Sequence, residues 1–120
     1  MIKPKQGEII LTDFDPIRGH EQSGYRPALV VSNTVFNTAS NLILVCPVTN
    51  TNRKKAMDIP LKGTKTTGYV LCEQIRAVDL FDRGYKQTGD ILPEETLLRV
   101  TDIIQGAIDV LQPSPAKNCQ

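Results

Sequence analysis

The sequence contains no tryptophan and a single histidine, and aromatic residues make up 5% of its 120 positions. No cysteine or second histidine lies near His20 at the spacing of zinc ligands, so we expect no structural zinc site. The neighbouring acids Asp13, Asp15 and Glu21 leave a Mg²⁺ site as an alternative. Asp13, however, alternates with the apolar residues of a predicted strand and is interpreted as a surface residue. We therefore expect neither a metal nor another cofactor.

Long hydrophobic runs and paired cysteines are also missing. The longest apolar run, Leu42 to Cys46, has five residues, whereas a membrane helix needs roughly 20. The three cysteines, Cys46, Cys72 and Cys119, are scattered without C-x-x-C spacing, which is typical of reduced thiols. The first residues lack the apolar core of a signal peptide. Together these absences predict a cytoplasmic protein that does not contact membranes.

Several catalytic motifs are absent. The sequence has no G-x-S-x-G, no Walker loop and no G-x-G-x-x-G, so serine hydrolase, nucleotide-binding and dehydrogenase functions have no support. A Ser-His-Asp or Cys-His triad needs a base held by a third group. Ser23 is only a loop neighbour of His20, and nothing places Cys46 beside it.

Short apolar segments bounded by Gly, Thr, Asp or Lys predict a mainly β fold. The predicted strands cover residues 7–14, 27–32, 42–49, 57–61, 68–72 and 75–80. Strands this short and this numerous favour a small sheet curled into a barrel. A chain of this length is expected to form one domain, here residues 1–112, followed by a flexible tail over 113–120.

One helix is predicted over about 93–111. Pro93 suits a first helical position, and Glu94 and Glu95 suit the first turn, where the helix dipole favours anions. Apolar residues then recur at three- and four-residue steps, which predicts a stripe that packs on the sheet.

Positive charge is concentrated in the middle of the chain. Residues 18–76 contain eight Lys or Arg against three acids, whereas residues 77–120 contain four against seven. The middle of the chain is therefore the part that suits a polyanion, although solvated loop lysines would give the same pattern. Two polar loops lie there, at residues 15–25 and 50–56.

Arg26 stands at the exit of the first loop, before Pro27. Proline cannot donate to a sheet ladder, so we expect Arg26 at a strand start with its guanidinium turned toward a ligand. A guanidinium matches a phosphate bidentately and keeps its charge. The alternative is an arginine that only pins its own loop through backbone carbonyls.

Four segments, which span about nine-tenths of the chain, resemble the MazF/PemK/ChpB toxins. They read GEII…DFDP…GHEQSGYRPALVVS over 7–32, LVCPVT over 44–49, TGYVLCEQIRAVD over 67–79 and LPEE over 92–95. These toxins are the endoribonucleases of bacterial type II toxin–antitoxin pairs. The resemblance implies a small SH3-like (PemK/CcdB-type) β-barrel with a C-terminal helix that works as a homodimer.

The resemblance also implies an activity and partners. The expected activity is cleavage of single-stranded RNA, chiefly mRNA, at a short preferred sequence. Attack by the 2′-hydroxyl would leave a 2′,3′-cyclic phosphate and a 5′-hydroxyl without a metal. A cognate antitoxin would neutralise the toxin and inhibit RNA binding, and DNA would be bound only through the toxin–antitoxin complex.

Three residues match the family's catalytic positions: Arg26, Thr49 and Glu21. Arg26 would stabilise the phosphorane, because a guanidinium is a poor base. Thr49 would donate its hydroxyl to a phosphate oxygen. The general base is left open between Glu21, which has the family precedent, and His20, which titrates nearer neutral pH.

Further residues are predicted to hold RNA through charge, stacking or base contacts. They are Arg18, His20, Tyr25, Arg53, Lys54, Lys55, Gln74 and Arg76. Tyr25 is the expected stacking residue, whereas Tyr69 and Phe81 are expected in the core. Gln74 and Arg76 would read bases or bridge the dimer interface.

Two other functions are alternatives. A non-catalytic SH3-like module that binds nucleic acid or protein has the same fold, and fold does not fix function. A gyrase poison of the CcdB type also has a similar fold, but that type depends on a C-terminal tryptophan, which this sequence lacks.

Overall fold

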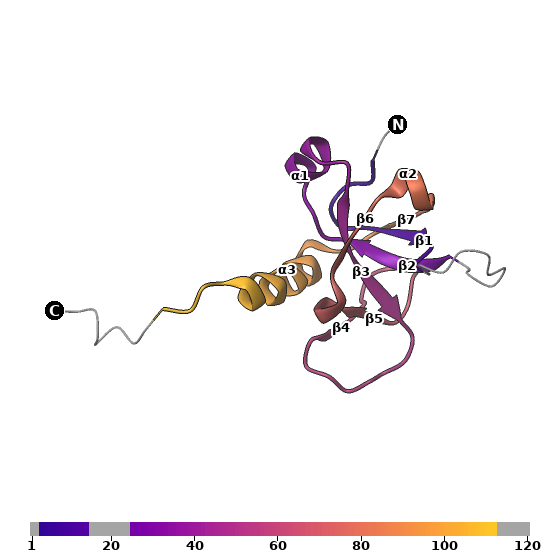
Figure 1. Cartoon of the computed structure of the whole chain (residues 1–120). Coiled ribbons are helices and arrows are strands. Elements are labelled where there is room, and N and C mark those ends of the chain that lie inside the picture. Colours follow the sequence, from indigo (N-terminus) through magenta and orange to yellow (C-terminus); the bar gives the residue numbers. More distant parts are fainter. Residues whose placement is uncertain (1–2, 15–24, 113–120) are drawn as a thin grey trace.

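The computed structural model describes residues 3–14 and 25–112, which form a twisted antiparallel sheet with a long helix on one side (Figure 1). The strands are β1 (Glu8–Thr12), β2 (Arg26–Val30), β3 (Ile43–Thr49), β4 (Asp58–Pro60), β5 (Tyr69–Leu71), β6 (Arg76–Val78) and β7 (Tyr85–Ile91). The helices are α1 (Thr34–Ala39), the 3₁₀ turn η1 (Cys72–Gln74), α2 (Leu80–Arg83) and α3 (Glu94–Ile108). A mainly β fold with a C-terminal helix is thereby confirmed.

The sheet is organised around β3. Its strand order is β4-β5-β3-β2-β1-β7, and β6 pairs with the first half of β3. The second half of β3 pairs instead with β5, where Thr49 lies opposite Tyr69. Among the described strands β4 and β7 are not paired with each other, so the sheet is open.

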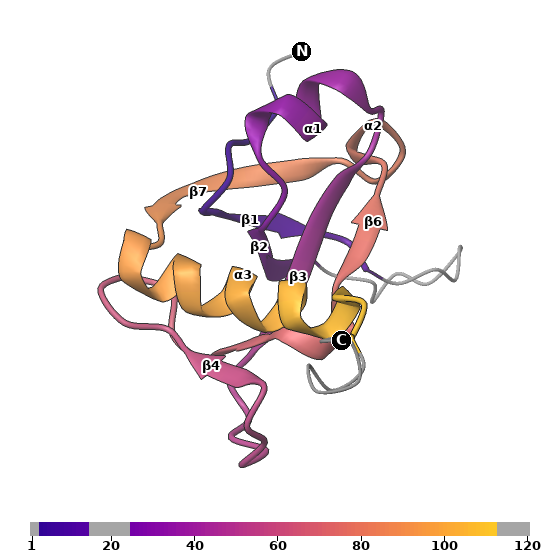
Figure 2. The same cartoon turned by 90° about the vertical axis from the view of Figure 1, so that its left-hand side faces the viewer.

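Both faces of the sheet are covered, which explains why its strands read as continuous apolar runs. Ile9 and Leu29 belong to a core on the face that α3 covers, together with Val100 of the helix. Their neighbours Ile10 and Val30 point the other way, into a second core with residues of β3, β6 and α2. Figure 2 shows α3 lying across the sheet.

The long helix α3 packs through one stripe and leaves its end exposed. Val100 is fully buried, and Leu97 and Ile104 pack against the same core. The helix ends at Ile108 rather than near residue 111, because Asp109 adopts an extended backbone (φ −64°, ψ 140°). Ile108 itself is 75% exposed. No helix in the described part of the chain is long and apolar enough to cross a membrane.

Two features of the fold differ from expectation. The strand β7 was not predicted, because its residues are mostly polar and only Asp90 among them is buried. It pairs with β1 at the end of the sheet. Phe81 was expected in the core, which is wrong: it lies on α2 and is 68% exposed. Tyr69, on β5, is half-buried.

Candidate functional site

A groove of about 540 Å³ opens beside the ends of several strands. It is lined by Phe14, Arg26, Pro47, Val48, Thr49, Leu71, Gln74 and Arg76. The structure thus brings together four residues that were singled out from the sequence, although they lie up to 50 positions apart. Of the remaining lining residues, Phe14 stands next to the first loop but was not singled out as a site residue.

Arg26 is the first residue of β2 and lies opposite Thr12 of β1. Its side chain is exposed, and within residues 3–14 and 25–112 its guanidinium has no hydrogen-bonding or ionic partner. Pro27 pairs with Leu11, while pairing with β3 begins only at Ala28. Arg26 therefore stands at the open end of the strand with its charge available to a ligand.

Thr49 is held in place as the last residue of β3. Its Oγ1 accepts a hydrogen bond from the backbone N–H of Thr51 at 3.2 Å, which leaves the hydroxyl proton available for donation. Gly68 (φ +122°) lies so close that a Cβ there would be 2.4 Å from the carbonyl oxygen of Thr49. Only glycine allows this approach of the two strands.

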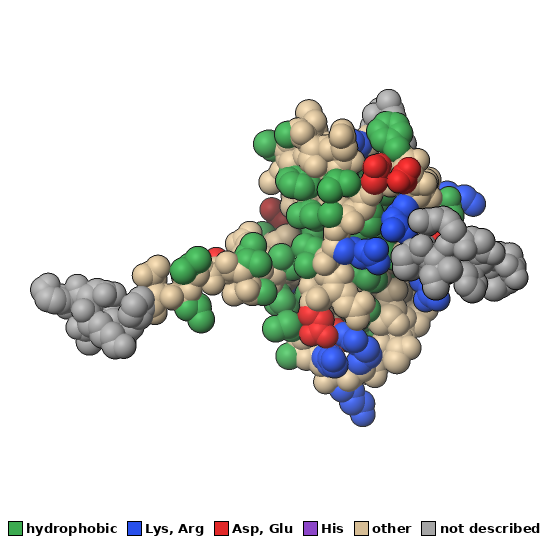
Figure 3. Space-filling view, viewed as in Figure 1, with side chains coloured by type: hydrophobic (Ala, Val, Ile, Leu, Met, Phe, Trp, Pro, Cys, Tyr) green, Lys and Arg blue, Asp and Glu red, His purple; other side chains and the backbone are tan. Residues whose placement is uncertain are grey.

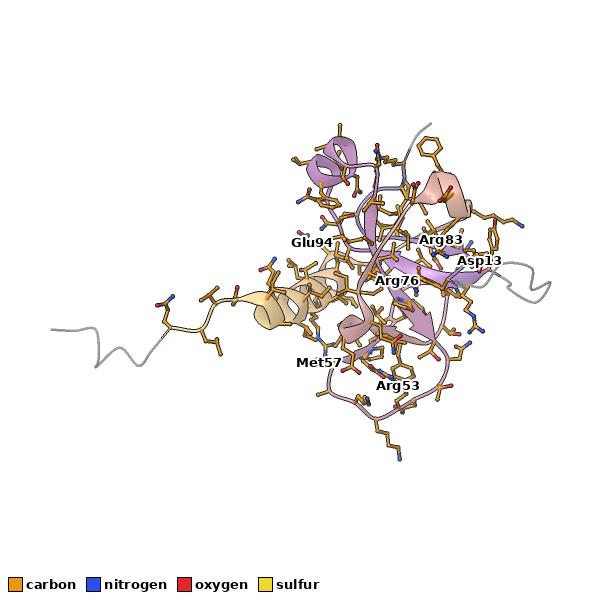
Figure 4. The ribbon with its side chains drawn as sticks, in the orientation of Figure 1. Asp13, Arg53, Met57, Arg76, Arg83 and Glu94 are labelled. Atoms are coloured by element: carbon orange, nitrogen blue, oxygen red, sulfur yellow. The ribbon has the colours of Figure 1, made fainter. Side chains whose placement is uncertain are left out.

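Arg76 begins β6 opposite Val45 and lies between Arg83 and Arg53 in the view of Figure 4. Its guanidinium carbon is 5.3 Å from the centroid of the Phe14 ring, which is the geometry of a cation–π contact. Gln74, at the end of η1, is exposed beside it. A second fixed cation and a neutral amide thus face the same groove as Arg26.

Tyr25 is not among the residues that line the groove. It is 43% exposed, and the Nζ of Lys86 lies 5.3 Å from its ring centroid. A Cβ at Gly84 would lie 3.0 Å from its hydroxyl. The ring is therefore next to α2 and β7, and Lys86 covers one of its faces.

The basic residues of the second loop differ in their partners. Arg53 donates two hydrogen bonds of 2.7 Å to Asp58, from Nε and Nη2. This fork lowers the pKa of the Asp58 carboxyl and raises the pKa of Arg53. Lys55 lies 3.4 Å from Glu73, whereas Lys54 is exposed. These acidic partners were not anticipated from the sequence.

Three of the predicted residues, Arg18, His20 and Glu21, lie outside the described residues. Within the described part, no three His, Cys, Asp or Glu side chains are grouped so that they could hold a metal ion.

The two described cysteines are free and buried. Burial raises the pKa of Cys46 to about 12 and that of Cys72 to about 11. Both thiols therefore stay protonated near neutral pH, which makes them poor nucleophiles.

Basic side chains spread over the face that carries the groove, as the space-filling view shows (Figure 3). Comparison with known proteins gives this face a context. Residues 5–108 match the family described as PemK-like, MazF-like toxin of type II toxin–antitoxin system.

Similar curated proteins include the endoribonuclease toxin MazF of Escherichia coli K12, which is 33% identical over 90% of this chain and 93% of its own length. The endoribonuclease toxin ChpB of the same strain is 39% identical over 84% of this chain and 94% of its own length. Among solved structures, a MazE–MazF crystal structure from Deinococcus radiodurans superposes with a TM-score of 0.78 at 30% identity, covering 88% of this chain and 95% of that one. With nearly its whole length matched in sequence and in structure, the chain belongs to the PemK-like, MazF-like family of type II toxin–antitoxin toxins.

Proposed function

We propose that this chain is a sequence-specific endoribonuclease toxin that cuts single-stranded mRNA and is neutralised by a cognate antitoxin. The observation that carries the proposal is the groove in which Arg26, Thr49, Gln74 and Arg76 meet. Two guanidiniums and a hydroxyl suit a phosphodiester, and the amide suits a base edge. Similar proteins named endoribonuclease supply the reaction class.

The reaction requires no metal or water. The 2′-oxygen attacks the neighbouring phosphorus and loses its proton to a base, for which we propose Glu21, with His20 as the alternative. The bond from phosphorus to the 5′-oxygen breaks, and that oxygen takes up a proton. The products are a 2′,3′-cyclic phosphate and a 5′-hydroxyl.

Arg26 and Thr49 act on the phosphate during this step. The charge on the phosphorane oxygens grows as the 2′-oxygen attacks, so fixed donors stabilise the transition state more than the ground state. Arg26 supplies a full positive charge and would also donate a proton to the 5′-oxygen as it leaves. The Thr49 hydroxyl donates to a phosphate oxygen without adding a charge that would need desolvation.

Other residues hold the RNA on either side of the cut. Gln74 and Arg76, which line the groove, would read bases, and Tyr25 would stack on a base with its exposed part. Arg18 and the basic segment that contains Arg53, Lys54 and Lys55 would face the RNA backbone. For the whole molecule we propose a cytoplasmic homodimer whose sheet is the curled SH3-like barrel of this family. An antitoxin segment rich in acids would compete with RNA for the basic groove.

The test compares Arg26→Ala with Arg99→Ala, a matched loss of one exposed arginine that lies on α3 outside the groove. We expect Arg26→Ala to lose cleavage of a long single-stranded RNA while RNA binding is largely kept, and Arg99→Ala to cleave as the wild type does. Equal cleavage by both variants would contradict the proposed role of the groove. Binding without cleavage by the wild type would favour the non-catalytic binding module.

A further inference from the structure

The segment between β3 and β4, residues 50–57, is ordered by its own polar side chains. The Asn50 Oδ1 accepts a hydrogen bond of 3.0 Å from the hydroxyl of Thr67, across the neighbouring strand connection. The Asn52 Oδ1 accepts one of 2.9 Å from the backbone N–H of Lys54. Lys54 takes a left-handed backbone (φ 59°), which no other non-glycine residue in the described chain does. The segment therefore has a defined turn rather than an extended, adaptable course.

The strongest contact of the segment is the fork of Arg53 on Asp58. Both of its hydrogen bonds measure 2.7 Å, and the Asp58 side chain is only 2% exposed. The same guanidinium lies 3.6 Å from the Glu73 carboxylate. A buried carboxylate holds its partner tightly, because separation would leave an unpaired charge out of water. The Arg53 guanidinium is therefore held by acidic side chains of the protein and is not available to a ligand.

The three cations of the segment, Arg53, Lys54 and Lys55, therefore differ in whether an acidic side chain offsets their charge. Lys55 lies 3.4 Å from Glu73, so a carboxylate also offsets its charge. Lys54 has neither an ion pair nor a side-chain hydrogen bond within residues 3–14 and 25–112, and its side chain is exposed. Of the three, only Lys54 presents an uncompensated charge.

The contacts of Arg53 with Asp58 and Glu73 form a clamp, and two parts of this clamp adjoin residues of the groove. Residue 50 directly follows Thr49, and Glu73 directly precedes Gln74, and both Thr49 and Gln74 line the groove. Arg53, with Asp58 and Glu73, thus fixes the segment against the two chain sections that carry these groove residues. In Figure 4 Arg53 lies below Arg76, and it is not among the residues that line the groove.

We infer that Arg53 is a positioning residue that holds the 50–57 segment so that Lys54 alone of its three cations contacts the RNA backbone. This inference rests on the proposed function and refines it: Arg53 and Lys55 are removed from the RNA contacts and given a structural role. The predicted consequence is one phosphate contact from this segment rather than three.

The first test measures how RNA affinity depends on salt, with a 2′-O-methyl RNA that cannot be cut by 2′-hydroxyl attack. The slope of log K against log salt is negative, and each lost phosphate contact reduces its magnitude by about 0.7 for a single strand. Lys54→Asn removes the charge with a residue that tolerates the left-handed backbone. Lys55→Gln removes the neighbouring charge, and Lys62→Gln, at an exposed lysine outside the groove, is the control. We expect the full decrease for Lys54→Asn and no change for Lys55→Gln or Lys62→Gln. Equal decreases for both, or none for Lys54→Asn, would overturn the inference.

The second test addresses Arg53. We expect Arg53→Gln to leave the salt slope unchanged but to lower kcat on a natural RNA on the order of 10-fold and to broaden the set of cut sites, because the segment is released. Arg53→Lys, which can keep one contact with Asp58, should restore part of both and guards against simple unfolding. A slope lowered by about 0.7 with unchanged cut sites would instead make Arg53 a direct phosphate contact.

These readouts separate two kinds of failure. Absence of cleavage by the wild-type protein contradicts the proposed function. The salt slopes are measured without cleavage, so they test independently whether Lys54 alone contacts the RNA backbone.

Discussion

Thr49 presents a single hydroxyl donor whose position is fixed by the surrounding backbone. Its Oγ1 accepts from Thr51 N–H, and the close approach of Gly68 holds the strand end. The proposed mechanism uses the one remaining donor of this side chain. A hydrogen bond to a charged group contributes about 1.5–3 kcal/mol.

We therefore predict that Thr49→Val lowers kcat on the order of 10- to 100-fold with little change in the fold. Thr49→Ser, which keeps the hydroxyl, should retain most of the activity. Single-turnover cleavage of one RNA by the three proteins measures the effect, and thermal unfolding controls for stability. Activity of Thr49→Val equal to that of Thr49→Ser would exclude a role for the hydroxyl.

The Arg53–Asp58 pair predicts how stability depends on pH. Arg53 lowers the pKa of Asp58 in the folded protein, so the pair stabilises the fold at pH values above the unfolded carboxyl value of about 3.9. This stabilisation is lost as the pH falls through the lower, folded value. Urea unfolding of the wild type and Asp58→Asn between pH 6 and 3 should show a smaller loss on acidification in the variant. Parallel curves would contradict the pairing.

The residues that line the groove could be predicted in part from the sequence, but the ion pairs around it could not. Arg26 could be singled out from its place before a proline, whereas Thr49 and the catalytic role of Arg26 followed from the resemblance to the MazF/PemK/ChpB toxins. The partners of Arg53 could not be predicted, because the sequence gives the number of charges in a loop but not which of them meet. Glu73 is 20 positions away and reaches Arg53 only because β5 and η1 return beside β4.

The pairing of β3 with β5 fixes the strand end that carries Thr49, and two glycines offer a comparison. A Cβ at Gly68 would meet the Thr49 carbonyl oxygen at 2.4 Å, whereas one at Gly106 of α3 would meet nothing within 4 Å. Gly68→Ala should therefore destabilise the protein by about 1–3 kcal/mol and reduce cleavage through a displaced Thr49. Gly106→Ala should stabilise it by up to about 1 kcal/mol. Urea unfolding at neutral pH measures both, and a neutral Gly68→Ala would contradict the geometry.

At the scale of elements, the apolar strands and the C-terminal helix could be predicted, because burial on one or both sides leaves a pattern in the sequence. The strand β7 could not, since only Asp90 among its residues is buried and Gly89 interrupts it. Its place is set by pairing with β1. Asp90 accepts hydrogen bonds from the backbone N–H groups of Lys65 and Thr66, a tertiary contact that no local pattern indicates.

In the whole molecule, the basic and the acidic parts of the sequence form different parts of the fold. The basic middle of the sequence, residues 18–76, includes the strand ends that form the groove, whereas the acidic C-terminal part includes α3, which packs on one face of the sheet. A polyanion bound in the groove would therefore meet Arg26 and Arg76 and stay away from the acids of α3. The same field would attract an acidic antitoxin segment, so RNA and antitoxin are expected to exclude each other.

Cleavage of RNA by 2′-hydroxyl attack leaves characteristic fragment ends, which can be mapped. Purified protein is incubated with a long single-stranded RNA in EDTA, and the 5′ and 3′ ends of the fragments are mapped. We predict discrete cuts at a short common sequence, with 2′,3′-cyclic phosphate and 5′-hydroxyl ends, and none with Arg26→Ala. Cleavage that needs a divalent metal and leaves 5′-phosphate ends, or no cleavage by the folded protein, would contradict this mechanism.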